Sequence, residues 1–374
     1  MSNDVHVKTL RATAVLGTGV GSDYNHAITQ SRNNTNESPM TMNKRITIVD
    51  VARESGVSVA QVGRALSEKG AVKPETREHV RSVAEKLGYR VNHSARQLAS
   101  KHSRDIGVVI GEPLNPFHIK MAEAINARLG ARDLISVVAL RGTGAPPLLD
   151  QIEHLLTIGV AGVILISTEP DPGLLTTIAE RVPTVYFGQE LADVNISTLS
   201  LDDEDIVQVG IRHLIQLGHR HIAHIDGGHS PSAEGRRRGY AAAMLAAGLP
   251  PRSIPGGHEL DHGRNGVLQL LASGDVPTAI FVDNDLSAIG AINGLFGRGL
   301  RVPEDVSILG FDDMPYAASE TMSLSTFRQD IVSHAIELVS AVEKRIKHPN
   351  AGPVSLKGTA KLVLRRSITA AKAG

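Results

Sequence analysis

The sequence contains no cysteine and no tryptophan, and aromatic residues make up only 3% of it. Without cysteine the chain cannot form disulfides, use a catalytic thiol or bind a metal through thiolates, which fits a reducing compartment such as the cytoplasm. The shortage of aromatic side chains argues against a stacking platform for single-stranded nucleic acid. An uninterrupted run of about 18 apolar residues is also missing, so the sequence predicts no transmembrane helix and no membrane partner.

The composition is otherwise that of a globular protein. The chain has 374 residues, which at about 100–200 residues per domain suggests two or three folded units. Hydrophobic residues make up 41% and charged residues 21%, so there is enough apolar side chain for sizeable cores.

Charge is unevenly distributed although the formal net charge is zero. Residues 43–104 carry 13 lysines and arginines against 6 acidic residues, whereas residues 105–374 carry 23 basic and 30 acidic residues. A basic block ahead of an acidic remainder is the charge layout expected of a DNA-binding head on a larger body. A solvated basic face without a partner is the alternative explanation.

Residues 1–42 are rich in Ser, Thr, Asn and Gly and show no sustained periodicity, so we predict a disordered extension there. They also lack the contiguous apolar segment of a secretory signal. Met40 and Met42 stand just before the periodic sequence begins, and the start of translation stays open between Met1, Met40 and Met42.

Three short helices are predicted over residues 43–91. Thr47 and Ser58 each precede an apolar helical pattern and are followed, three residues later, by a side chain that completes a capping box. The third helix opens at Pro74, whose fixed φ suits a first helical turn, and it ends at Gly88. Two helices joined by a short glycine-containing turn, with a third for support, predict an all-α helix-turn-helix unit.

The pattern changes at Ile106, where short apolar runs begin to alternate with amphipathic helical stretches. Strands buried on both faces and followed by helices predict α/β structure with doubly wound parallel sheets, and about 260 residues suggest two lobes with a cleft between them. The predicted strands are residues 106–110, 136–140, 162–166, 184–187, 222–225, 279–282 and 307–311.

A more specific signal lies in residues 47–66, which read Thr-Ile-Val-Asp-Val-Ala-Arg-Glu-Ser-Gly-Val-Ser-Val-Ala-Gln-Val-Gly-Arg-Ala-Leu. This segment resembles the N-terminal signature of the lac-repressor/galactose-repressor family of transcription factors. The similarity covers the chain from about residue 45 to 367 and includes Thr76, Arg77, Leu87, Gly88, Tyr89, Asn92, Ala95, Leu98 and Ala99.

The resemblance implies a domain order. A helix-turn-helix domain at 43–91 is followed by a hinge helix and linker at 92–104, a periplasmic-binding-protein-like effector-binding and dimerisation domain at 105–367, and a tail at 368–374. We place the first lobe at about 105–203 plus 303–330, and the second at about 204–302 plus 331–367.

Residues at the start of the second helix are the candidates for reading DNA bases. Gln61 suits adenine and Arg64 suits guanine, whereas Val59 and Ala60 can only contact a thymine methyl group or fill space. Thr47 and Ser58, at helix starts, are better placed for phosphates. The alternative is that Val59 packs inside. The family usually has Thr and Ser where this chain has Gln61 and Gly63, so its operator preference does not transfer.

Residues 92–101 match the family's hinge. Asn92 can cap a short helix with Ala95 and Leu98 on one side, and such a helix is too short to be stable alone in water. The resemblance implies that the helix orders on DNA, where two copies in a dimer insert Leu98 into the minor groove and kink the duplex. An ordinary linker helix with Leu98 packed on its own domain is the alternative.

Polar side chains that match the family follow several strands of the body, where ligands bind in open α/β sheets. Asn115 can exchange hydrogen bonds with a hydroxyl, Arg236 offers a bidentate fork and Asp285 suits a pair of sugar hydroxyls, while Phe117 can stack on an apolar face. Helix caps or surface ion pairs are the alternatives. Lesser candidates are Phe187, which we include in the effector set, Gln189 and His258, and we interpret Asp312 and Asp313 as mainly structural.

Metal binding and catalysis find no support in the sequence. His219, His221, His224 and His229 lie close together, but strand alternation places His219 and His221 on one face and His224 on the other. No Gly-x-Ser-x-Gly motif stands between a strand and a helix. We therefore predict neither metal nor cofactor, and a protein that is not an enzyme.

Together these features predict a cytoplasmic, nucleoid-associated transcriptional regulator, most often a repressor in such families. It is expected to bind a pseudo-palindromic double-stranded operator as a homodimer and to respond to a small sugar or sugar derivative between its lobes. A sugar-binding protein without regulatory DNA binding is the alternative function.

Overall fold

The computed structural model describes residues 46–66, 72–89, 103–168, 171–191, 193–274 and 276–372. The chain divides into two compact units, Met1–Asn92 and His93–Gly374. We call the described residues of the first unit the head and those of the second unit the body. Within these ranges, no helix has both the length and the apolar character needed to cross a membrane.

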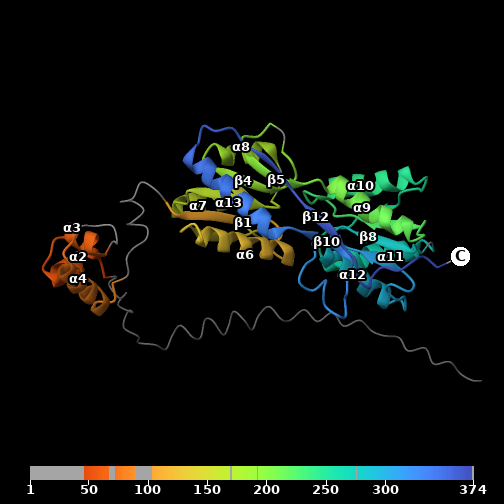
Figure 1. Cartoon of the computed structure of the whole chain (residues 1–374), viewed down its shortest axis with the longest axis horizontal. Coiled ribbons are helices and arrows are strands. Elements are labelled where there is room, and N and C mark those ends of the chain that lie inside the picture. The colour runs from red at the N-terminus through yellow and green to blue at the C-terminus, as the bar shows by residue number, and fades with distance from the viewer. Residues whose placement is uncertain are drawn as a thin grey trace, which may run out of the picture. The chain divides into compact units, whose positions relative to one another are not determined.

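The described residues of the head form three helices (Figure 1). Thr47 starts the first helix with a capping box, because its Oγ1 accepts from the Asp50 amide while the Asp50 carboxylate accepts from the Thr47 amide. The helix ends at Gly56, whose φ of 68° is left-handed and costs glycine little. The helices are α2 (Ile48–Ser55), α3 (Val59–Leu66) and α4 (Pro74–Lys86).

Each helix contributes two buried apolar residues to the head core. Val62 and Ala65 are three positions apart and Val80 and Ala84 are four apart, so each of these pairs lies on one helical face. Val51 and Ala52 follow Ile48 by three and four positions and share its face, as the sequence pattern predicted. The core consists of Val51, Ala52, Val62, Ala65, Val80 and Ala84.

The first lobe of the body is built on a six-stranded parallel sheet in the order β11-β5-β4-β3-β1-β2. Apolar clusters lie on both faces of this sheet; Val108 belongs to one cluster and Val109 to the other, as strand alternation requires. The strands are β1 (Asp105–Ile110), β2 (Ile135–Leu140), β3 (Gly162–Ile166), β4 (Thr184–Gly188), β5 (Ser197–Leu201) and β11 (Ser355–Gly358). The helices are α6 (Pro116–Gly130), α7 (Leu148–Ile158), α8 (Pro172–Ala179) and α13 (Ile331–Lys347).

The second lobe contains a four-stranded parallel sheet in the order β7-β6-β8-β9, again with an apolar cluster on each face. The strands are β6 (Ile222–Ile225), β7 (Ser253–Ile254), β8 (Ala279–Val282) and β9 (Ser307–Leu309). The helices are α9 (Asp203–Gln216), α10 (Ala233–Ala246), α11 (Leu260–Ala272) and α12 (Asp285–Phe296). A separate antiparallel pair is formed by β10 (Thr326–Gln329) and β12 (Ala360–Val363).

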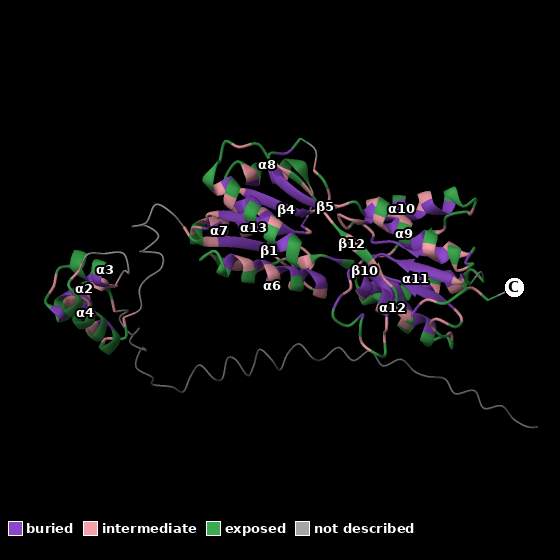
Figure 2. Cartoon of the chain, viewed as in Figure 1, coloured by how far each residue is buried: buried purple, intermediate pink, exposed green. Residues whose placement is uncertain are grey.

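The doubly wound α/β architecture is therefore confirmed, and the strands of both sheets are mostly buried (Figure 2). One predicted strand is less buried than the others: Val138 and Leu140 on β2, at an edge of the first sheet, are 49% and 51% exposed. Val137 and Ala139, which alternate with them, pack against the core, so one face of β2 is covered and the other is exposed.

The predicted assignment of the C-terminal segments to the two lobes is wrong. Strand β9, within 303–330, pairs with β8 in the second lobe, whereas α13 and β11, within 331–367, belong to the first. Alternation of strands and helices reveals a parallel sheet, but it does not say which of two sheets receives each element. The predicted tail is also part of the fold up to Ala371, whose amide donates to the Leu217 carbonyl at 2.9 Å.

Candidate functional site

The candidate DNA-reading residues at the start of α3 are exposed. Val59 is 43% exposed, so the alternative that it packs inside is wrong. Ala60, Gln61 and Arg64 are exposed as well, whereas Val62 on the other helical face is completely buried. This arrangement leaves the first turn of α3 accessible to a duplex.

The side chain of Gln61 contacts Ser58 at the start of α3. Its Oε1 lies 3.2 Å from both the backbone nitrogen and the Oγ of Ser58. In return, Ser58 Oγ lies 3.3 Å from the backbone nitrogen of Gln61. This is the predicted capping box. A Gln61 side chain that reached an adenine edge would have to release Ser58, so base contact and helix capping compete.

The other predicted DNA contacts divide into two groups. Thr47 is exposed, and its Oγ1 donates to the Asp50 carboxylate at 2.7 Å. Thr47 and Ser58, which we predicted to contact phosphates, therefore already use their side chains to cap helices. The predicted hinge residues Asn92, Ala95 and Leu98 lie outside the described residues.

In the body, polar side chains gather at the carboxyl ends of strands from both lobes. Glu112 follows β1 and Ser167 follows β3 in the first lobe, while Asp283 and Asp312 follow β8 and β9 in the second. Glu112, Ser167 and Asp312 line a small cavity of about 30 Å³, which we call the inner cavity, and Asp283 contacts two of its lining residues, Arg236 and His258. Its lining consists of Glu112, Asn115, Phe117, His118, Ser167, Phe187, Gly188, Leu201, Asp203, Pro231, Ser232, Arg236, His258, Asp312 and Gln329.

A larger cavity of about 630 Å³, the outer cavity, adjoins the inner one. Glu112 and His258 are among the residues that line both. Its volume lies within the range of about 300–1,000 Å³ that is usual for ligand sites. Glycine loops supply much of its wall, at Gly111, Gly142, Gly227, Gly228, Gly256 and Gly257.

Four of the five predicted effector residues line the inner cavity: Asn115, Phe117, Phe187 and Arg236. Asn115 caps α6, because its Oδ1 accepts from the Phe117 amide at 3.0 Å, and its Nδ2 donates to Asp312 at 3.1 Å. The rings of Phe117 and Phe187 lie 6.2 Å apart and form an apolar wall.

Asp285 lines neither of these two cavities, so its predicted contact with the effector stays a prediction. Its side chain is fully buried and accepts from Thr326 Oγ1 at 2.6 Å and from the Met314 amide at 2.9 Å. Burial raises its pKa well above the usual value, and the nearby Asp312 adds to the shift. In this structure Asp285 therefore holds the loop after β9.

Asp312, which we interpreted as mainly structural, lines the inner cavity instead. Its φ of 115° and the φ of 52° at Asp313 place two successive aspartates in the left-handed region, a strained backbone of the kind found at functional sites. Its carboxylate accepts from Asn115 Nδ2 and from Gln329 Nε2, the latter at 2.9 Å.

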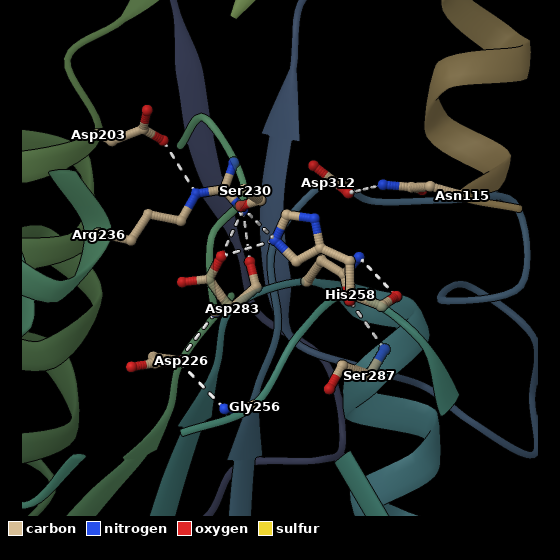
Figure 3. Close-up of polar contacts among 12 residues, drawn as sticks. Asn115, Asp203, Asp226, Ser230, Arg236, Gly256, His258, Asp283, Ser287 and Asp312 are labelled. Atoms are coloured by element: carbon tan, nitrogen blue, oxygen red, sulfur yellow. Dashed lines mark hydrogen bonds and ion pairs between the residues drawn. The ribbon is translucent and has the colours of Figure 1, made fainter. Parts of the chain in front are cut away.

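Arg236 is buried within an ion-pair network (Figure 3). Its Nε donates to Asp203 at 3.0 Å, its Nη1 donates to the carbonyl of Asp283, and its guanidinium carbon lies 3.7 Å from the centre of the Phe311 ring. Burial raises the pKa of Asp203 to about 6, although Arg236 beside it opposes the shift.

His258 joins the two lobes, and Figure 3 shows its contact with Asp283 of the second lobe. Its Nδ1 lies 2.8 Å from Glu112 Oε2 in the first lobe, and its Nε2 lies 2.9 Å from Asp283 Oδ2 in the second. Burial lowers its pKa, but the two carboxylates outweigh burial and raise the pKa to about 10. Gly227 permits this approach, since a Cβ there would lie 2.3 Å from Asp283 Oδ2 and 2.7 Å from His258 Nε2.

Sequence reasoning missed Glu112, His118, Asp203 and Gln329 as cavity residues. Glu112 lies two positions after the end of the predicted strand at 106–110, so its position at a strand end was an available signal. Asp203 begins α9 after β5, a strand that the sequence pattern did not reveal. Gln329 lies on β10, a strand that the pattern did not reveal.

The histidines at 219–229 do not converge. His219 Nε2 lies 2.9 Å from the carbonyl of Thr369, while His224 is fully buried and stacks on Phe281 with 4.8 Å between ring centres. No group of three metal-binding side chains occurs among the residues that the structure describes.

Comparison with protein families finds two matches in this chain. Residues 47–92 match the model of bacterial regulatory proteins of the lacI family, and residues 211–368 match the periplasmic binding protein-like domain. The first match covers the head, and the second covers most of the second lobe with α13 and β11.

Individual relatives extend over both units. The chain is 33% identical to catabolite control protein A of Priestia megaterium, over 72% of this chain and 82% of the relative. It is 32% identical to the lactose operon repressor of Escherichia coli strain K12, over 77% and 81%. A crystal structure of the lac repressor dimer bound to operator and an anti-inducer superimposes with a TM-score of 0.76 and 28% identity, over 87% of this chain and 100% of the other. The chain belongs to the lacI family of bacterial regulatory proteins.

Proposed function

We propose that this protein is a cytoplasmic transcriptional repressor that binds a pseudo-palindromic DNA operator as a homodimer and is controlled by a sugar-like effector. One observation carries the proposal: the same chain presents an exposed first turn of α3 and a polar cavity whose walls come from two lobes. The lac repressor dimer, solved on its operator with an anti-inducer, supports it. The proposed role is regulatory and needs no catalysis.

The lobes provide the switch. Glu112 on the first lobe and His258 on the second meet at 2.8 Å, so a ligand that enters the inner cavity must replace or rearrange a contact between lobes. A ligand that prefers one lobe arrangement shifts the population toward it. In the proposal this shift reaches the hinge residues Asn92, Ala95 and Leu98. If the two states differ about 100-fold in effector affinity, the coupling is about 2.7 kcal/mol.

The DNA-binding part is tested by selecting duplexes from a random library with the full chain, followed by mobility shift at several salt concentrations. We expect enrichment of a pseudo-palindromic site. A solute-binding protein without regulatory DNA binding would enrich no sequence and would leave duplexes unretarded at low salt, which would contradict the proposal.

Gln61→Glu separates base reading from helix capping. Glutamate still accepts from Ser58, so α3 keeps its cap, but it cannot donate to adenine. We expect affinity for the selected operator to fall about 10–100-fold, corresponding to about 1–3 kcal/mol for a bidentate base contact. Gln61→Ala is the matched comparison, because it removes both the cap and the base contact. Unchanged operator affinity in Gln61→Glu would show that Gln61 does not read a base.

A further inference from the structure

The inner cavity differs from an anion site in how its cations are used. Arg236 donates to Asp203 at 3.0 Å and also to Asp283, and His258 contacts Glu112 and Asp283 at 2.8 and 2.9 Å. Both positive side chains lining the cavity are thus engaged by carboxylates of the protein itself. An acidic ligand would have to displace one of these carboxylates before it gained a cation.

Unlike these paired cations, one hydrogen-bond acceptor in the inner cavity lacks a partner among the described residues. Gln329 is 5% exposed and lines the cavity, yet its Oε1 has no partner among the described residues. The orientation of this amide follows from its Nε2, which donates to Asp312 Oδ1 at 2.9 Å. Because a buried acceptor without a partner is costly, a ligand that donates a hydrogen bond to this atom is favoured.

The balance of charge points the same way. Glu112, Asp203 and Asp312 line the cavity, and Asp283 lies directly behind it, against two cations, Arg236 and His258. In a poorly hydrated site an added negative group beside these carboxylates is repelled more strongly than in water. Hydroxyl groups face no such repulsion and can donate to the remaining carboxylate lone pairs.

We propose that the effector is a polyhydroxylated, hydrogen-bond-donating compound without a carboxylate or phosphate group. This inference rests on the proposed function, because it specifies the ligand of the same site. Neutral sugars and polyols meet the requirement, and an amino group in place of a hydroxyl meets it as well. Sugar acids and sugar phosphates do not.

Matched sugar series test the inference with the full chain. Thermal shift and calorimetry measure the binding of neutral compounds: glucose, galactose, mannose and xylose, short oligomers of each, and mannitol, sorbitol and ribitol. Each is compared with its amino sugar, uronic acid and 6-phosphate where these exist. We expect the binding compounds to lack an acidic group and each acid to bind at least tenfold more weakly than its neutral parent. Tighter binding of an acid or a phosphate overturns this inference but supports the proposed function. If no compound binds while the chain still selects an operator, the sugar-effector part of the proposed function fails, and this inference with it.

Asp203→Asn provides a gain-of-binding test. Replacing this carboxylate by an amide releases Arg236 from an ion pair, so the guanidinium becomes available to a ligand carboxylate. We expect the uronic acid of the best-binding series to gain at least tenfold in affinity relative to its neutral parent. Glu204→Gln is the control, because this neighbouring carboxylate pairs with the exposed Arg238 at 2.9 Å and lines neither cavity. If Asp203→Asn and Glu204→Gln bind the uronic acid equally well relative to its neutral parent, the inference that protein carboxylates exclude anionic ligands is overturned.

Discussion

In the head, the residues assigned to DNA that the structure describes lie within one short segment, 47–64, and their side chains are exposed. In the body, the residues around the inner cavity come from segments as far apart as Glu112 and Gln329, and most of them are buried. An exposed side chain can change with little effect on the fold, whereas a buried charge holds the fold together through its partners. The comparison teaches that binding and stability are coupled in the body, whereas in the head they are separable except at Thr47, Ser58 and Gln61, which also cap helices.

The largest expected effect is that of Arg236→Ala. Removal of the guanidinium leaves Asp203 and Asp283 as buried carboxylates without this partner, and breaking a buried pair costs about 3–5 kcal/mol. We expect the free energy of unfolding of the body to fall by that amount in urea titrations. Arg238→Ala on the same helix is the control: its side chain is 57% exposed, so its ion pair with Glu204 contributes at most about 1 kcal/mol. Similar losses in both variants would break the comparison between buried and exposed charge.

A smaller effect is expected from pH, through His258. Its pKa is raised to about 10 in the folded chain, so the stabilisation is complete below the ordinary value of 6.5 and is lost as pH rises toward 10. The loss is at most about 1.4 kcal/mol per pH unit, or about 2 kcal/mol between pH 7 and 8.5. Urea unfolding at these two pH values measures it. His258→Gln, which lacks the titrating group, should lose less; parallel pH profiles would show that the bridge to Glu112 and Asp283 does not stabilise the charged imidazole.

The head was predictable because its signals are local. The capping boxes that start at Thr47 and Ser58 span four residues each, and Pro74 and Gly88 mark the limits of α4 within a few residues. Apolar strands of the body were predicted for a similar reason, since a buried strand is a continuous apolar run. Strand β5, with the polar residues Ser197, Thr198 and Ser200 among its leucines, gave no such signal.

The cavity was harder to predict, because it depends on the direction of side chains after each strand. Asp285 and Asp312 both follow buried strands, and the sequence alone favoured Asp285. In the structure Asp285 begins α12 and contacts Thr326 and Met314, whereas the left-handed backbone at Asp312 directs its carboxylate to Asn115 and the cavity. Such turn conformations are set by tertiary contacts, which no local pattern reports.

Thr47→Ala is expected to have a moderate effect confined to the head. The substitution removes the Oγ1 that accepts from the Asp50 amide, and loss of a helix cap costs about 1 kcal/mol. Thermal unfolding of the full chain should show a lower head transition and an unchanged body transition. Thr47→Ser keeps the hydroxyl and should behave like the parent chain. A shift of the body transition would contradict the separation of the two units.

The smallest stability effect is expected for Val59→Ala. Val59 is 43% exposed at the start of α3, so losing its methyl groups should change the free energy of unfolding by no more than about 0.5 kcal/mol, while alanine's higher helix propensity partly compensates. Val62→Ala, three residues along the same helix, removes the same atoms from a fully buried position and should cost about 2 kcal/mol. After correction for the folded fraction, Val59→Ala should weaken operator binding more than Val62→Ala does, because only Val59 faces outward and can contact a thymine methyl group. If Val59→Ala bound the selected operator as tightly as the parent chain, the exposed start of α3 would not be the surface that reads the bases.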